Sequence, residues 1–149
     1  YLIDTIAAVS GQIYDTNKIE VIHTIVDDGS QSLESLAVIE RIRDLSFLNF
    51  IRQSNGGLPS ARNTGIRSIC SDYILPLDSD DVIHPCLIQE LYNYLESLNF
   101  PHNILLSPNM VSFGSYNRRI RIHIPNLYTI CKANYLPVST LFSKRYVFN

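Results

Sequence analysis

The stretch Leu77-Asp78-Ser79-Asp80-Asp81 places three carboxylates within four residues. It follows the apolar run Tyr73-Ile74-Leu75-Pro76, which is typical of a short strand. Like charges this close repel one another unless a positive charge lies among them. Mg²⁺ and Mn²⁺ prefer oxygen ligands, and Mg²⁺ commonly binds one or two carboxylates together with substrate phosphates. The stretch therefore predicts a metal-diphosphate site at a strand end. A solvated acidic turn before a helix is the alternative.

The composition is that of a folded globular protein. Of 149 residues, 46% are hydrophobic and 17% are charged, and the length predicts one domain. A net charge of -2 gives no reason to expect a nucleic-acid partner, because nucleic-acid-binding proteins carry a basic face. The three cysteines, Cys70, Cys86 and Cys131, are widely spaced and form no CxxC pair, which argues against a disulfide framework and a zinc site.

The expected location is the cytoplasm, which the cysteine usage favours. No run approaches the roughly 20 consecutive apolar residues that a membrane helix needs, and the first residues lack the pattern of a signal peptide. Association with the inner face of the membrane, through regions outside this chain, stays open.

Helices and strands are expected to alternate over residues 1–100. The spacing of apolar residues and the β-branched runs predict these elements. The expected helices cover residues 1 to about 11–15, 31–42, 60–70 and 85–98, and the expected strands cover residues 19–26, 47–52 and 72–77. Pro59 suits the first turn of one helix and Pro85 can open another, while Ser30 is expected to cap the helix from Gln31.

The pattern changes beyond residue 100. Residues 104–107, 109–113 and 138–142 are typical of short strands, and residues 119–124 alternate with period two. Together they predict antiparallel structure with one solvated face, while residues 127–135 are ambiguous. The whole order predicts an α/β fold with a mostly parallel central sheet and a small antiparallel C-terminal portion. Ligands of such folds bind at the carboxyl ends of the strands, where the acidic stretches of this chain fall.

Three stretches at predicted strand ends together resemble a known family. They read Val26-Asp27-Asp28-Gly29-Ser30, then Gln53-Ser54-Asn55-Gly56-Gly57 with Ala61-Arg62-Asn63-Thr64-Gly65-Ile66, then Leu77-Asp78-Ser79-Asp80-Asp81. In order and spacing they resemble the family 2 inverting glycosyltransferases of the GT-A fold, over nearly the whole chain. The resemblance implies a GT-A-like, three-layer α/β/α nucleotide-binding fold similar to the Rossmann fold. It implies one partial domain over residues 1–149, with a nucleotide-sugar-binding half at 1–100 and the start of the acceptor-side half at 101–149.

The resemblance also implies roles for the residues that match the motifs. Asp27 would recognise the base of the nucleotide, and Asp28 would hold the edge of the same pocket. Arg62 would approach the base or the diphosphate, and Asn63 would brace the pocket wall. Asp78 would lie near the ribose.

The metal ligand implied by the resemblance is Asp80, with Asp78 as a second candidate. Asp81 would support the metal from outside its ligands or cap the following helix. The expected cofactor is Mn²⁺ or Mg²⁺, which would neutralise the diphosphate as it leaves.

The implied reaction moves a sugar from a nucleotide-diphosphate sugar, with UDP-sugars preferred, onto an acceptor hydroxyl with inversion. This is a hexosyltransferase-type activity (EC 2.4), in the synthesis of cell-wall or other polysaccharides or of glycoconjugates. The acceptor would be a saccharide, a lipid-linked molecule or a protein.

Neither the family's general base nor its first strand is recognised within the chain. The base is expected beyond Asn149, since His102 and His123 read as structural or solvated histidines, and the strand is expected before Tyr1. We therefore expect an internal portion of a longer transferase, inactive on its own.

Three alternative functions compete with this interpretation. A catalytically inactive nucleotide-sugar-binding domain would carry the same motifs. A sugar-1-phosphate nucleotidylyltransferase should show a Gly-rich loop with a basic residue near its first strand, and this chain shows none. A calcium loop starting at Asp78 would put Ile83 where glycine is required and Gln89 where a bidentate Glu is needed, so that interpretation fails.

Overall fold

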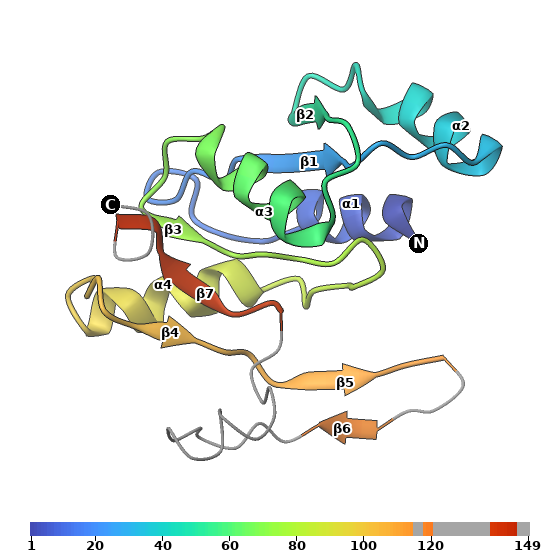
Figure 1. Ribbon diagram of the computed structural model, residues 1–149. Coiled ribbons are helices and arrows are strands. Elements are labelled where there is room, and N and C mark those ends of the chain that lie inside the picture. Colours follow the sequence, from blue (N-terminus) through green and yellow to red (C-terminus); the bar gives the residue numbers. More distant parts are fainter. Residues whose placement is uncertain (115–117, 121–137, 146–149) are drawn as a thin grey trace, which may run out of the picture. The chain divides into compact units, whose positions relative to one another are not determined.

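The computed structural model describes residues 1–114, 118–120 and 138–145 (Figure 1). The end of the predicted strand 119–124 and the ambiguous residues 127–135 lie outside the described residues, as do His123 and Cys131. The chain divides into two compact units, one formed by residues 1–71 and 79–99 and the other by residues 72–78 and 100–149. The predicted division at residue 100 stays a prediction.

The first unit is built around one pair of parallel strands. Its elements are α1 (Leu2–Ser10), β1 (His23–Asp27), α2 (Leu33–Ile42), β2 (Leu48–Arg52), α3 (Leu58–Arg67) and α4 (Leu87–Ser97). The register runs from His23 opposite Leu48 to Asp27 opposite Arg52. Both strands therefore end at the same edge, and the loops that follow them start side by side.

The four helices predicted in this unit are present, with two corrections at their starts. Helix α2 begins at Leu33, and its N-cap is Ser32, whose hydroxyl accepts the backbone N–H of Ser35 at 3.1 Å. The predicted cap at Ser30 is wrong, because the backbone N–H of Ser30 donates to Asp27 Oδ1 at 3.0 Å instead. Pro59 does lie in the first turn of α3, while Cys86 and not Pro85 directly precedes α4.

The core of the first unit comes mostly from the inner faces of its helices, with Ile83 from the segment before α4. Its buried apolar side chains are Ile6, Ile39, Ile42, Ala61, Ile66, Ile83, Leu91 and Leu95. Figure 1 shows α3 running alongside β1. The two approach closely at Gly65, where an added Cβ would lie 3.2 Å from Cγ2 of Val26. Even with no side chain at Gly65, there is therefore little spare room between α3 and the strand.

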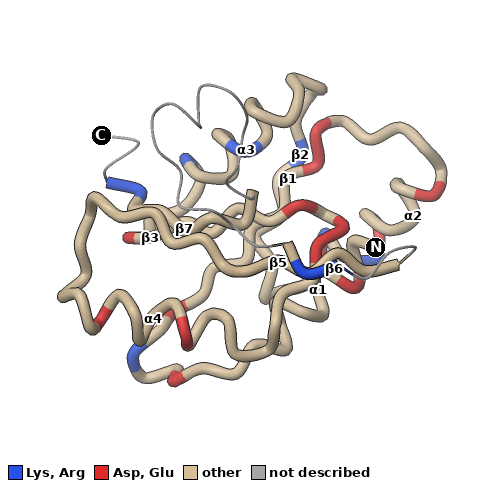
Figure 2. The backbone as a smooth tube through the Cα atoms, turned by 90° about the horizontal axis from the view of Figure 1, so that it is seen from below, with Lys and Arg blue, Asp and Glu red and all other residues tan. Residues whose placement is uncertain are grey.

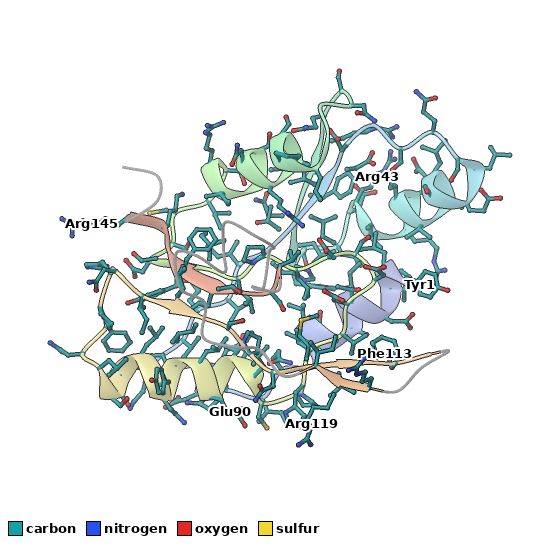
Figure 3. The ribbon with its side chains drawn as sticks, turned by 60° about the horizontal axis from the view of Figure 1, so that its bottom comes forward. Tyr1, Arg43, Glu90, Phe113, Arg119 and Arg145 are labelled. Atoms are coloured by element: carbon teal, nitrogen blue, oxygen red, sulfur yellow. The ribbon has the colours of Figure 1, made fainter. Side chains whose placement is uncertain are left out.

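The second unit is antiparallel in its described part. Its strands are β3 (Tyr73–Ile74), β4 (Leu105–Leu106), β5 (Met110–Ser112), β6 (Arg118–Ile120) and β7 (Leu141–Ser143). Strand β7 pairs antiparallel with both β3 and β4, and β5 pairs antiparallel with β6. Figure 3 labels Phe113 and Arg119 at this β5–β6 pair, where both are exposed. The α/β class and the antiparallel C-terminal portion are thus confirmed.

Two predicted strands are shorter than expected. The strand predicted at residues 72–77 is paired only at Tyr73–Ile74, because Pro76 has no N–H with which to extend the ladder. The strand predicted at residues 19–26 begins at His23, where the pairing with β2 begins. Within the described residues, no helix combines the length and the apolar character needed to cross a membrane.

Candidate functional site

The first loop of the candidate site leaves β1 at Asp27, which is buried. Its Oδ1 accepts the backbone N–H of Ser30 at 3.0 Å, and its Oδ2 lies 3.2 Å from Nε of Arg52 at the end of β2. Oδ2 has almost no accessible surface and makes no hydrogen bond of good geometry, so the contact with Arg52 is an ion pair. Arg52 also donates from Nη2 to the Ser30 carbonyl at 2.9 Å. In Figure 2 basic residues (blue) and acidic residues (red) lie next to each other where β1 and β2 end.

Asp28 joins this loop to the loop that follows β2. Its Oδ1 accepts Nε2–H of Gln53 at 2.7 Å and the backbone N–H of Gly56 at 2.9 Å. These hydrogen bonds lower the pKa of Asp28, with the Gly56 amide as the largest cause and the Gln53 side chain next. The carboxylate therefore links the loop after β1 to the loop after β2 by hydrogen bonds between residues 25 or more apart in the sequence.

Glycine permits the close approach of these two loops. Gly29 has a φ of +75°, and a Cβ on it would lie 2.9 Å from the backbone nitrogen of Asn55. A Cβ on Gly56 would lie 2.7 Å from Oγ of Ser60. Any larger residue at position 29 would meet both backbone strain and a backbone clash.

Helix α3 starts directly after the second loop and carries the predicted residues Arg62 and Asn63. Gly57 precedes it with a φ of +81°, and both side chains are half-buried near the middle of the helix. The positive end of the helix dipole lies beside Gly56, whose N–H binds the Asp28 carboxylate. The loops after β1 and β2 thus form one hydrogen-bonded pair, which includes Asp27 and Asp28. Arg62 and Asn63 lie on α3, the helix that starts after the second loop.

The acidic stretch is divided between the two units. Asp80 is exposed and Asp81 is half-buried in the first unit, while the half-buried Asp78 is the last residue of its segment in the second. No cluster of three His, Cys, Asp or Glu among the described residues could enclose a metal ion. One or two carboxylates do suit Mg²⁺ or Mn²⁺ that arrives on a diphosphate and keeps its waters. These residues fit a nucleotide-borne metal, and the roles of Asp78, Asp80 and Asp81 stay predictions.

Outside the two loops, His102 has the contacts of a structural residue. In the second unit, Nδ1 of His102 lies 3.3 Å from the buried hydroxyl of Ser143. Cys70 and Cys86 are free thiols.

Sequence reasoning missed Arg52 and two buried polar residues of the first unit, Thr5 and Gln12. Arg52 could have been found from the strand register, which puts it opposite Asp27 at the end of a parallel pair. Thr5 and Gln12 carried no such signal, because the stripe predicted for the first helix was apolar.

With this geometry in place, comparison with known proteins decides the family. The sequence model of glycosyl transferase family 2 matches residues 1–139. The chain belongs to glycosyl transferase family 2. Poly(ribitol-phosphate) beta-N-acetylglucosaminyltransferase TarP of Staphylococcus aureus strain N315 is 34% identical over 91 residues, which cover 60% of this chain and 27% of that protein.

A second relative has a longer match. Glycosyltransferase GlyA of Streptococcus pneumoniae serotype 4 is 32% identical over 124 residues, which cover 83% of this chain and 17% of that protein. The chain therefore spans about a quarter or less of the length of these two relatives.

Solved structures with a similar fold are also known. The crystal structure of S. aureus TarS residues 1–349 in complex with UDP has a TM-score of 0.65 and 19% sequence identity, and covers 97% of this chain and 43% of that one. This likeness confirms the GT-A glycosyltransferase fold.

Proposed function

We propose that the protein containing this chain is a glycosyltransferase that moves a sugar from a nucleotide-diphosphate sugar, a UDP-sugar, onto an acceptor hydroxyl with inversion at the anomeric carbon. The observation that carries the proposal is the bonded pair of loops after β1 and β2, in a chain that belongs to family 2. TarS, which shares the fold, was crystallised in complex with UDP, and this supports the choice of nucleotide.

The two loops would form the nucleotide end of the donor site. Asp28 and Gly29 hold the loops together, and the ion pair between Asp27 and Arg52 fixes the turn that follows β1. We assign recognition of the base to this edge. Asp27 is the residue proposed to read it, and to do so its carboxylate would exchange its contact with Ser30 or Arg52 for the base. Arg62 would contribute a fixed positive charge toward the base or diphosphate, and Asn63 would support the pocket wall.

The transfer itself is a displacement in which the acceptor oxygen bonds to the anomeric carbon as the bond to the diphosphate oxygen breaks. The hydroxyl proton passes to a general base. Asp78 would lie near the ribose and is the second candidate for the metal, while Asp80 would hold a Mn²⁺ or Mg²⁺ ion. That ion supplies electrostatic stabilisation of the charge that develops on the departing diphosphate.

The relatives support a class of acceptor and no single acceptor molecule. TarP is named for transfer to poly(ribitol-phosphate), a polymer that carries many hydroxyl groups. We propose a saccharide, lipid-linked or protein acceptor in polysaccharide or glycoconjugate synthesis, in the cytoplasm or at the inner face of the membrane.

Thermal unfolding tests the donor site. Mn²⁺ and UDP together should raise the melting temperature more than the sum of the shifts with either alone, because a ligand stabilises the state that binds it. Asp80→Ala should abolish the synergy. Asp44→Ala, which removes an exposed carboxylate at the end of α2, should keep it. Additive shifts in the wild type, or synergy that survives in Asp80→Ala, would contradict the metal-assisted donor site.

A further inference from the structure

Residues 79–88, which carry Asp80 and Asp81, are held by polar side chains from the start of the chain. Thr5 is 4% exposed, and its hydroxyl donates to the Ser79 carbonyl at 3.0 Å across 74 residues of sequence. The same hydroxyl also lies 3.4 Å from the Tyr1 carbonyl one turn earlier in α1. A hydroxyl has a single hydrogen to donate, and the shorter contact with Ser79 is the better hydrogen bond.

The carbonyl that Thr5 binds belongs to the peptide unit that begins Asp80. Because a peptide unit is planar, holding the oxygen of Ser79 also holds the nitrogen of Asp80 and restricts where the Asp80 carboxylate can point. Asp80 itself is exposed and lies in a turn, so its own side chain does little to fix it. The buried hydroxyl of Thr5 is therefore an anchor of the predicted metal ligand.

Gln12 anchors the other end of the same segment. Its side-chain amide donates to the carbonyls of Ala8 at 3.1 Å and His84 at 2.8 Å, and its Oε1 accepts the backbone N–H of Ile88 at 3.1 Å. Gln12 is 9% exposed, so these three bonds satisfy a buried amide that would otherwise be costly. The backbone adds a bond from the N–H of Ile13 to the Pro85 carbonyl at 2.8 Å.

We propose that Thr5 and Gln12 are positioning residues, which present Asp80 in one place to the metal that the donor carries. The inference rests on the proposed function, since it assumes a nucleotide-borne Mn²⁺ or Mg²⁺. Thr5 fixes the segment just before Asp80, the buried Ile83 fixes it just after Asp81, and Gln12 fixes it where it enters α4. Helix α1 thus acts on the donor site through the backbone of residues 79–88 without touching the ligand.

A Mn²⁺ titration followed by electron paramagnetic resonance, with saturating UDP, tests the role of Thr5. Thr5→Val keeps the shape and removes the hydroxyl, and it should weaken Mn²⁺ binding by about tenfold, the low end for residues that orient metal ligands. Thr5→Ser restores the hydroxyl and should restore the affinity. The matched control is Thr24→Val, which removes a hydroxyl that accepts a hydrogen bond from Asn49 in β2. Its Mn²⁺ affinity should equal that of the wild type.

The outcomes separate this inference from the proposed function. Wild-type protein that binds no Mn²⁺ in the presence of UDP would overturn both. Wild-type binding that Thr5→Val weakens no more than Thr24→Val does would overturn the positioning role and leave the donor site standing. Tighter binding in the wild type and Thr5→Ser than in Thr5→Val, with Thr24→Val unchanged, supports the positioning role.

Hydrogen exchange of the wild-type protein gives a second test that needs no variant. Adding Mn²⁺ and UDP should slow amide exchange in residues 79–84 and in the first turns of α1 together, because one hydrogen bond couples them. Exchange in α2 should not change. Protection confined to residues 79–84, with α1 unaffected, would overturn the coupling.

Discussion

Asp27 and Arg52 show how a single charge pair organises the end of the parallel strands. The side chain of Asp27 is 4% exposed, that of Arg52 is 48% exposed, and both contact Ser30. A buried carboxylate is costly to desolvate, and here a backbone N–H and a guanidinium offset that cost. The pair stabilises the turn that carries Asp28 and Gly29, so its effect extends to both loops of the proposed donor site.

Removing the guanidinium should destabilise the fold measurably. We expect Arg52→Met to lower the free energy of unfolding by about 1–3 kcal/mol, the cost of leaving a buried charged group without its partner. Arg43→Met removes an exposed arginine that pairs with Glu40 at 2.9 Å, and it should cost about 0.5 kcal/mol or less. Urea unfolding measures both. Equal losses in the two variants would show that the Asp27 pair is no more than a surface ion pair.

Gly29 should be among the glycines least tolerant of substitution. Gly29→Ala must adopt a φ of +75° and also bring a Cβ within 2.9 Å of the Asn55 backbone, so we expect a loss of about 2–4 kcal/mol. Gly114 has a φ of +98° with nothing within 4 Å of the added Cβ, so Gly114→Ala should cost only about 1 kcal/mol. The comparison uses the same unfolding measurement. A Gly29→Ala loss no larger than that of Gly114→Ala would mean that the loops separate without cost.

At the scale of elements, strand β1 is central to the first unit, and it begins with a half-buried histidine. The Nδ1 atom of His23 is buried and has no hydrogen-bond partner among the described residues. Burial lowers the pKa of His23 from the ordinary value of 6.5, because the charged imidazolium loses hydration. The unfolded chain therefore binds this proton more readily than the folded protein does.

This histidine should make stability depend on pH in a defined direction. Its contribution is complete above pH 6.5 and declines as the pH falls below that value, since protonation favours the unfolded state. Urea unfolding at several pH values between about 5 and 7.5 should show this slope in the wild type and a weaker slope in His23→Leu. The exposed His84 provides the control, and His84→Asn should keep the wild-type slope. An unchanged slope in His23→Leu would contradict the assignment.

The elements of the first unit could be predicted well from periodicity, because amphipathic helices bury one stripe each. Ile39, Ile42, Leu91 and Leu95 fall on the predicted stripes and are buried. Strand lengths were harder to predict, because they depend on backbone pairing. Strand β1 starts only where β2 can pair with it, and β3 stops before Pro76. The cap of α2 was misplaced because the turn after β1 runs on to Ser32, with Asp27 accepting the N–H of Ser30 and Ser32 accepting that of Ser35.

The candidate site was predictable only in part, because it too depends on contacts between residues that are distant in the sequence. Asp27, Asp28 and the glycine-rich loop follow from motifs at strand ends, which parallel pairing brings to one edge. The partners that hold them, such as Gln53 on Asp28 and Thr5 on Ser79, depend on contacts across 25 and 74 residues. Local sequence patterns carry no information about such distances.

At the scale of the whole molecule, the chain matches only part of its family 2 relatives. It spans 27% of TarP and 17% of GlyA, so most of each relative lies outside the matched region. The first unit contains the bonded loops, α3 and the anchored segment 79–88, and these are the parts that we propose for the nucleotide and its metal.

Calorimetric titration of UDP, with uridine as the comparison, tests the central claim most directly. Titrations in Mn²⁺ and in a metal chelator should differ by about tenfold or more in the dissociation constant of UDP, because a metal held by Asp80 would neutralise charge on the diphosphate. Uridine lacks the diphosphate and should bind equally in both conditions. An affinity for UDP that is the same with and without metal, or no binding of UDP at all, would contradict a metal-assisted nucleotide-sugar site.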